Sequence, residues 1–180
     1  KERVLMALGH QEPDRVPLDV WLPSGVGRVL HEMLAIPESD RAYGLPKRLG
    51  HDLLKSPMAG VCEGFGSINH PERQIGPNLF EDKFGIQWRK ADYGHGAYCE
   101  FAAHPLADPR AYDAYVWPDP LGAARTAIEG CKALVASEGA SYAIMGSIPC
   151  TVFESAWYLR GMEAFLMDVV SNRDFAEELL

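Results

Sequence analysis

The chain has 180 residues, of which 47% are hydrophobic and 23% are charged, enough apolar material for the core of one ordinary domain. Its 17 basic and 25 acidic residues give a net charge of -8, which argues against sequence-independent binding of nucleic acid, because such binding needs clustered Lys and Arg. No apolar run reaches the roughly 18 residues of a membrane-spanning helix, so we expect a soluble protein with no membrane partner. The chain begins without Met and stops inside a helical pattern, so we expect both ends to be cut.

The first third of the chain predicts short helices and strands in alternation. Apolar spacing predicts helices over residues 1–8, 24–36 and 42–49. Residues 16–20 alternate in polarity behind a Pro-fixed turn, which predicts a strand, and residues 51–57 predict a second short strand.

The middle of the chain departs from this pattern. Residues 60–76 are rich in Gly and polar side chains, which predicts a mobile loop or an active-site lid. Residues 77–88 and 98–104 are two extended segments around a Gly-containing turn near Gly94. This arrangement predicts a β-hairpin inserted into a βα pattern.

The stretch from residue 141 to residue 161 is the one around which we expect the chain to be organised. A helix over residues 121–137 precedes it, a short buried strand over 142–145 opens it, and a helical pattern starting at Val152 follows a Pro-containing turn. In α/β folds the loop after a parallel strand carries the chemistry. We therefore predict site residues in this loop and helix: Ser147, Thr151, Glu154, Trp157, Tyr158 and Arg160.

Two carboxylates and one arginine accompany the predicted N-terminal strands. Asp19 and Asp52 could face one pocket, where carboxylates can hold a cationic intermediate or a nitrogen-bound hydrogen. A carboxylate that caps a turn is an equal alternative for Asp19. Arg28 lies near a helix start, where an anionic substrate group is also favoured by the helix amides. No G-x-G-x-x-G is present, so we predict no nicotinamide or flavin site.

The cysteines do not form a metal or disulfide pattern. Cys62, Cys99, Cys131 and Cys150 show no CxxC, CxxH or HxC pairing. We therefore expect free thiols in a reducing, cytoplasmic compartment, and no metal site built from this segment alone.

Five segments carry a family resemblance in this order: KERVLMALGHQEPDRVPLDVW, LGHD, FEDKFGIQW, WPDP and FESAWYLRGMEAFLMDVV. Together they resemble the N-terminal half of the uroporphyrinogen decarboxylase superfamily, which also holds the corrinoid-dependent methyltransferases. The resemblance covers essentially the whole chain. It implies an α/β fold in which residues 1–180 are the N-terminal portion of a single (β/α)8 TIM-barrel domain, with a β-hairpin excursion and the C-terminal half missing. A full barrel takes about 250 residues.

Departures from the decarboxylase pattern decide between the branches of this superfamily. The decarboxylases carry R-Q-A-G-R-Y-L-P-E after the first strand, and its two arginines hold substrate carboxylates. Here SGVGRVLHE keeps Arg28 at the second arginine but has Ser24 at the first. The essential aspartate, which meets pyrrole nitrogens, is matched by Asp52. The place of the decarboxylase tyrosine is occupied by Trp157, with Tyr158 one residue on.

The resemblance implies methyl transfer between a small donor or acceptor and a corrinoid (cobalamin) protein. Its cofactors in the full-length protein would be the corrinoid and zinc, whose ligands come mainly from the later half of the barrel. The alternative is uroporphyrinogen decarboxylation in porphyrin biosynthesis, a lyase reaction that needs no cofactor. A second alternative, of another class, is a non-catalytic docking module.

The positions of residues beside the predicted strands and the resemblance together give the predicted site residues and the partners. Asp52 and Tyr158 are the predicted catalytic residues, and the predicted substrate-binding residues are Asp19, Arg28, Trp157, Thr151 and Glu154. The expected partners are a small-molecule or tetrapyrrole substrate and a corrinoid protein, and a homodimer is compatible with the family.

Overall fold

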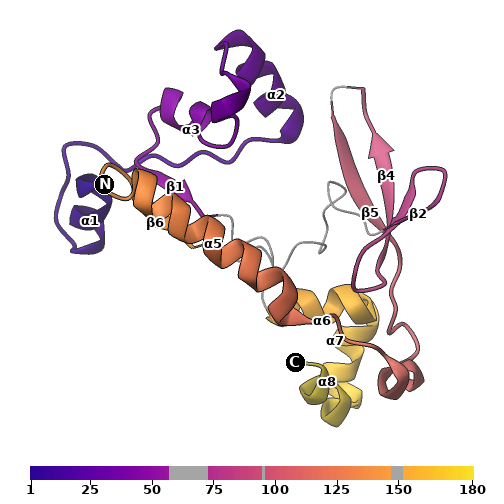
Figure 1. The fold of residues 1–180 in the computed structure, drawn as a ribbon. Coiled ribbons are helices and arrows are strands. Elements are labelled where there is room, and N and C mark those ends of the chain that lie inside the picture. The colour runs from indigo at the N-terminus through magenta and orange to yellow at the C-terminus, as the bar shows by residue number, and fades with distance from the viewer. Residues whose placement is uncertain (57–72, 95, 147–151) are drawn as a thin grey trace. The chain divides into compact units, whose positions relative to one another are not determined.

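The structure of the protein is a computed structural model. It describes residues 1–56, 73–94, 96–146 and 152–180. Figure 1 follows the chain from its N-terminal helix to its C-terminal helices. The chain divides into two compact units, the first made of Lys1–Met58 and Ala124–Ser147 and the second of Ala59–Ala123 and Ile148–Leu180.

The first unit is built around a small parallel sheet. Its elements are α1 (Glu2–Leu8), α2 (Ser24–Met33), the 3-10 helix η1 (Glu38–Asp40), α3 (Gly44–Arg48), β1 (Leu53–Lys55), most of α5 (Pro120–Glu138) and β6 (Ala143–Met145). The strands β1 and β6 pair in parallel, with Leu54 opposite Ile144. Parallel neighbours need a long crossover connection, so this pairing joins two distant parts of the sequence.

The apolar core of the first unit is small. Leu45, Leu54 and Leu134 come from α3, β1 and α5, and each is at most 5% exposed. Buried polar side chains lie at both ends of β1: His51 and Asp52 precede the strand and Ser56 follows it. Much of the polar chemistry of this unit is therefore located at the two ends of one strand.

The helices and strands predicted from the sequence of this unit are present in the structure, with one exception. The helices predicted over residues 1–8, 24–36 and 42–49 correspond to α1, α2 and α3, and the two predicted strands on either side of α5 are β1 and β6. The predicted strand over 16–20 is wrong, because these residues form no strand.

Leu18 explains why that strand is missing. Its carbonyl oxygen accepts a hydrogen bond from the Asp52 backbone N–H at 3.0 Å, but its own N–H donates to the Asp52 side chain at 2.8 Å. The preceding residue, Pro17, has no N–H to donate. A side chain therefore takes the place that a partner strand's carbonyl would occupy.

The second unit combines an antiparallel sheet with helices. Its elements are β2 (Arg73–Gly76), β3 (Leu79–Glu81), β4 (Gln87–Asp92), β5 (Ala97–Ala103), the 3-10 helix η2 (Pro109–Ala114), α6 (Val152–Arg160), α7 (Met162–Ser171) and α8 (Arg173–Leu179). The strands lie in the order β2-β3-β4-β5, each antiparallel to the next. The hairpin predicted around Gly94 is formed by β4 and β5, but the bounds of its predicted first arm are wrong. Residues 77–88 hold β3, the turn after it and the start of β4, and β4 continues to Asp92.

A buried carboxylate holds the turn between β3 and β4. The Oδ1 atom of Asp82 accepts from the backbone N–H groups of Phe84 and Ile86 at 2.9 and 3.0 Å, and its Oδ2 atom accepts from Trp88 Nε1 at 2.8 Å. Burial raises the pKa of Asp82 although these three donors lower it. The hydrogen bonds fix Trp88 against the core of the unit, which also contains Leu106, Leu159 and Phe165.

The described residues thus form a mixed α/β structure with one small parallel and one small antiparallel sheet. The strands in this described part do not close into a barrel. The loop predicted at 60–76 lies outside the described residues up to position 72, and residues 73–76 form β2. Among the described helices, none has the length and apolar character needed to cross a membrane.

Candidate functional site

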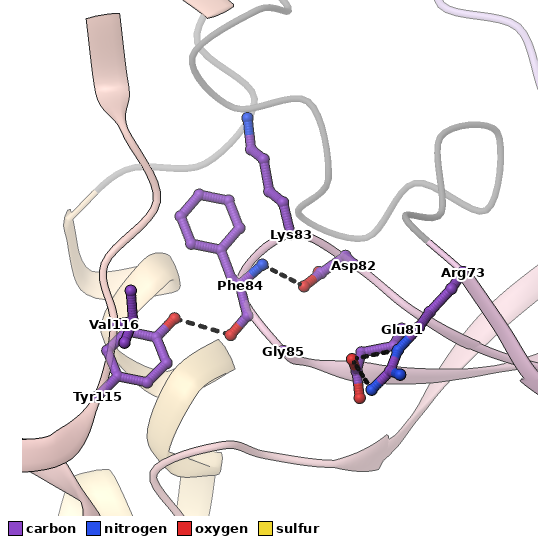
Figure 2. A pocket seen from close by; sticks show the side chains of 8 residues that line it. All are labelled: Arg73, Glu81, Asp82, Lys83, Phe84, Gly85, Tyr115 and Val116. Atoms are coloured by element: carbon purple, nitrogen blue, oxygen red, sulfur yellow. Dashed lines mark hydrogen bonds and ion pairs between the residues drawn. The ribbon is translucent and has the colours of Figure 1, made fainter. Parts of the chain in front are cut away.

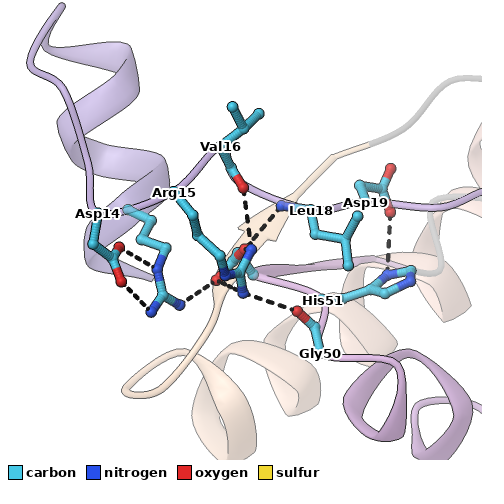
Figure 3. Close-up of polar contacts among 9 residues, drawn as sticks. Asp14, Arg15, Val16, Leu18, Asp19, Gly50 and His51 are labelled. Atoms are coloured by element: carbon cyan, nitrogen blue, oxygen red, sulfur yellow. Dashed lines mark hydrogen bonds and ion pairs between the residues drawn. The ribbon is translucent and has the colours of Figure 1, made fainter.

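Asp52 is the centre of a polar network in the first unit. Its Oδ1 atom accepts from Arg3 Nη1 at 2.9 Å and from Arg15 Nη2 at 3.1 Å. Its Oδ2 atom accepts from Arg15 Nη1 at 2.6 Å and from the Leu18 N–H at 2.8 Å. Arg3 also donates two hydrogen bonds to the carboxylate of Asp14 (Figure 3).

These contacts use the hydrogen-bonding capacity of the Asp52 carboxylate. A carboxylate offers about four lone-pair positions, and the network fills that number. Burial opposes the charge of Asp52, but the Leu18 N–H and the two guanidinium groups more than offset it and lower its pKa to about 2. Asp52 is a buried anion that is 4% exposed. Its contacts connect α1 and the segment after α1 to the start of β1. Its catalytic role stays a prediction.

A second polar group lies beside this network. Asp19 Oδ1 is 3.4 Å from Nδ1 of His51, and Asp19 Oδ2 is 2.9 Å from Nζ of Lys55. His51 is 7% exposed, and its Nε2 atom is buried without a hydrogen-bond partner among the described residues. Figure 3 shows Asp19 directed at the ring of His51. Of these two adjacent residues, Asp52 is a carboxylate that contacts arginines, whereas His51 contacts the carboxylate of Asp19.

Arg28 is on the surface of α2. Its side chain is 64% exposed, and Nη1 is 3.4 Å from Glu32 Oε1, one turn further along the helix. Asp19, Arg28 and Asp52 therefore contact three different sets of partners. The common pocket that the sequence suggested for the two carboxylates is not formed by these contacts, and their substrate-binding roles stay predictions.

The predicted site residues of α6 belong to the second unit. Trp157 and Tyr158 are half-buried and pack on Phe101 of β5, with ring centroids 5.0 and 4.8 Å apart. The Tyr158 carbonyl oxygen lies 2.7 Å from His104 Nδ1. Both aromatic rings therefore contribute to packing of the helix on the sheet.

The other predicted site residues between positions 141 and 161 differ in their environments. Glu154 is half-buried in the first turn of α6. Arg160 is buried, and its Nε donates to Asp168 Oδ2 at 2.6 Å, which makes it a structural side chain. Ser147 and Thr151 lie outside the described residues.

An open pocket of about 570 Å³ lies beside the turn between β3 and β4 (Figure 2). Arg73 at its edge donates to Glu81 Oε1 at 2.9 Å, and the Tyr115 hydroxyl donates to the Phe84 carbonyl at 2.7 Å. Burial and the charge of Asp82 raise the pKa of Tyr115. The polar groups named here are engaged with one another, so the pocket offers weaker support for chemistry than the Asp19 and His51 contact.

Metal ligands are not gathered in the described part of the chain. Within it, no group of three or more His, Cys, Asp or Glu side chains could hold a metal ion. Cys99 and Cys131 are half-buried and form no disulfide among the described residues, and they belong to different units. Cys62 and Cys150 lie outside the described residues.

Three residues of these contacts were missed by sequence reasoning. Arg3 and Arg15 are the partners of Asp52, and Lys55 is a partner of Asp19. Arg15 follows Asp14 in a Pro-bounded turn, which is a signal for a fixed backbone but not for a partner 37 residues away. His51 was visible as a neighbour of Asp52, but nothing local indicated that it would be buried.

Comparison of the chain with protein-family models, with curated proteins and with solved structures finds no match in any of the three.

Proposed function

We propose that this protein is an enzyme of the uroporphyrinogen decarboxylase superfamily, on its methyl-transfer side, and that it moves a methyl group between a small molecule and a corrinoid protein. The proposal starts from the ordered segments that resemble this superfamily over essentially the whole chain. Its fold would be the N-terminal part of a (β/α)8 barrel, and the antiparallel sheet β2-β3-β4-β5 would be the excursion from it.

The parallel sheet supports the barrel part of the proposal. β1 and β6 are neighbours and parallel, α5 leads into β6, and α6 follows it in the chain. A (β/α)8 barrel repeats this strand and helix order, and it requires all of its strands to be parallel. An antiparallel pairing of β1 and β6 would have argued against it.

The hydrogen bonding of Asp52 favours the proposal of methyl transfer over that of decarboxylation. In a decarboxylase of this superfamily, the matching aspartate would have to accept hydrogen bonds from pyrrole nitrogens. Here both oxygens already accept from Arg3, Arg15 and the Leu18 N–H, and the carboxyl group is 4% exposed. Opening this network would take the charged hydrogen-bond donors away from the buried Asp52 carboxylate, which is unfavourable.

The proposed zinc would be held by residues other than those described. The described residues do not form a zinc site, so no step of the reaction is assigned to a metal held by them. In the proposed reaction the corrinoid would carry the methyl group. The residues described here would supply the barrel wall, and Asp52 would hold the N-terminal segment against β1.

A pair of turnover assays on the full-length protein tests the proposal. The protein is supplied with zinc, methylcobalamin and ethanethiol, and loss of the cobalt-bound methyl group is followed by absorbance. In parallel, uroporphyrinogen is supplied and its carboxylated products are separated by chromatography. We expect demethylation well above the rate without protein, and no decarboxylation.

Two variants make the outcomes distinct. Asp113→Asn alters an exposed carboxylate on η2 and should leave demethylation unchanged. Decarboxylation that is lost in folded Asp52→Asn protein would replace methyl transfer with the decarboxylase alternative. A folded protein with neither activity would exclude both reactions and leave the docking module.

A further inference from the structure

The strongest unexplained feature is the Nε2 atom of His51. It is buried, and it has no hydrogen-bond partner among the described residues. The side chain as a whole is 5% exposed. A buried polar atom without a partner is unfavourable and uncommon in folded proteins, and it often marks a position where a ligand or water binds.

Asp19 determines which hydrogen His51 carries. Its Oδ1 atom faces Nδ1 of the ring at 3.4 Å, a separation longer than an ordinary hydrogen bond but short enough for a strong electrostatic effect (Figure 3). A carboxylate beside one ring nitrogen favours the tautomer with the hydrogen on that nitrogen. The hydrogen is then on Nδ1, and the buried Nε2 presents a lone pair.

Lys55 keeps this arrangement close to electrical balance. Its Nζ atom is 2.9 Å from Asp19 Oδ2, so Lys55 compensates the charge of Asp19. Lys55 and Asp19 are 39% and 29% exposed at their side chains, whereas His51 is buried. The cluster therefore has a partly exposed ion pair beside a buried imidazole.

We propose that Asp19, His51 and Lys55 form a binding site for a small neutral ligand that carries a hydroxyl or thiol group. The ligand donates its hydrogen to Nε2 of His51 and so satisfies the unpaired atom. Anions are disfavoured, because a deprotonated group has no hydrogen to donate to the Nε2 lone pair. This site does not depend on the methyl-transfer proposal, since it follows from the contacts of three side chains.

Two isomeric probes test the site. Ethanethiol and dimethyl sulfide contain the same atoms, but only ethanethiol has a hydrogen to donate. Each is titrated into the full-length protein labelled with nitrogen-15, and the ring nitrogens of His51 are followed by NMR. We expect the Nδ1–H tautomer before titration, and a saturable shift of Nε2 with ethanethiol but not with dimethyl sulfide. Ethanol is titrated in the same way, to separate hydroxyl from thiol ligands.

Controls and variants complete the test. His10, which is exposed, should show no saturable shift. Asp19→Asn removes the charge that orients the ring, so the Nε2–H tautomer should increase and ethanethiol should bind roughly tenfold more weakly. The proposal is wrong if His51 carries its hydrogen on Nε2 in the original protein, if both isomers shift it equally, or if none of the probes shifts it. These readings use the unaltered protein, so they stand even where the variant does not fold.

Discussion

At the scale of single residues, Asp52 shows how a carboxylate can be buried and remain charged. It is 4% exposed, yet its pKa falls to about 2, because the Leu18 N–H, Arg3 and Arg15 offset the effect of burial. The two arginines are partly exposed, at 36% and 42% of their side chains, so they can return to water when the carboxylate is removed. The main loss in a variant would therefore be the hydrogen bonds to Asp52 itself.

Asp52→Asn should destabilise the first unit by about 2 to 4 kcal/mol near neutral pH, because charged hydrogen bonds are lost in a buried position. The pKa of Asp52 is lower in the folded state than its ordinary 3.8, so its contribution is present above that value and is lost as pH falls toward about 2. Urea unfolding measured from neutral to acidic pH should show the original protein and the variant converging in this window.

Asp113→Asn is the matched control for that series, because it changes an exposed carboxylate by the same substitution. It should unfold like the original protein at every pH. An Asp52→Asn variant within about 0.5 kcal/mol of the original at neutral pH, the usual range for surface substitutions, would show that the network adds little.

At the scale of elements, the junction between α6 and α7 depends on one glycine. Gly161 has φ +92 and ψ 135, a conformation that is open to Gly and strained for other residues. Its N–H donates to the Trp157 carbonyl at 2.8 Å, and its carbonyl accepts from Phe165 N–H at 2.9 Å. The end of one helix and the start of the next are therefore held by the same residue.

Gly161→Ala should destabilise the second unit by about 1 to 3 kcal/mol, because alanine is strained at this φ. The added Cβ would also lie 3.3 Å from His104 Cδ2. Gly27→Ala, inside α2 with no atom within 4 Å of the new Cβ, should instead stabilise by about 0.5 to 1 kcal/mol. Thermal unfolding of both variants measures the contrast, and equal effects would mean that the backbone of Gly161 relaxes.

At the scale of the whole molecule, the chain folds as two units with separate buried polar networks. The first contains Asp52 and its arginines, and the second contains Arg160, which contacts Asp168 and the carbonyl oxygens of Leu106 and Ala107. The chain passes between the units three times, since each is built from two segments. Each network makes its contacts inside one unit, so removal of a network should destabilise its own unit first.

Arg160→Met should leave Asp168 buried and unpaired and destabilise the second unit by about 3 to 5 kcal/mol. Hydrogen exchange should then accelerate in α7 and in the backbone near Leu106, while the amides of β1 and β6 keep their original rates. Asp52→Asn should give the reverse pattern. Equal acceleration of both units by either variant would show that they unfold together.

Local periodicity was sufficient to predict most of the helices and strands. The helix at 121–137, the strands at 51–57 and 142–145 and the hairpin around Gly94 are each signalled by their own side chains and by nearby Gly or Pro, and each is present. The strand expected at 16–20 failed for a reason that is not local, because the Asp52 side chain takes the Leu18 N–H.

The amino-acid sequence by itself determined most of the secondary structure, the acidic balance and the identity of the candidate polar residues, since these depend on composition and on neighbours along the chain. Only the tertiary structure decided which of them meet across the chain: Asp52 with Arg3 and Arg15, and Asp19 with His51 and Lys55. A carboxylate has the same formula whether it is saturated by two guanidinium groups or faces an imidazole. Partners 32 to 49 residues apart in sequence set that difference, and no local pattern encodes them.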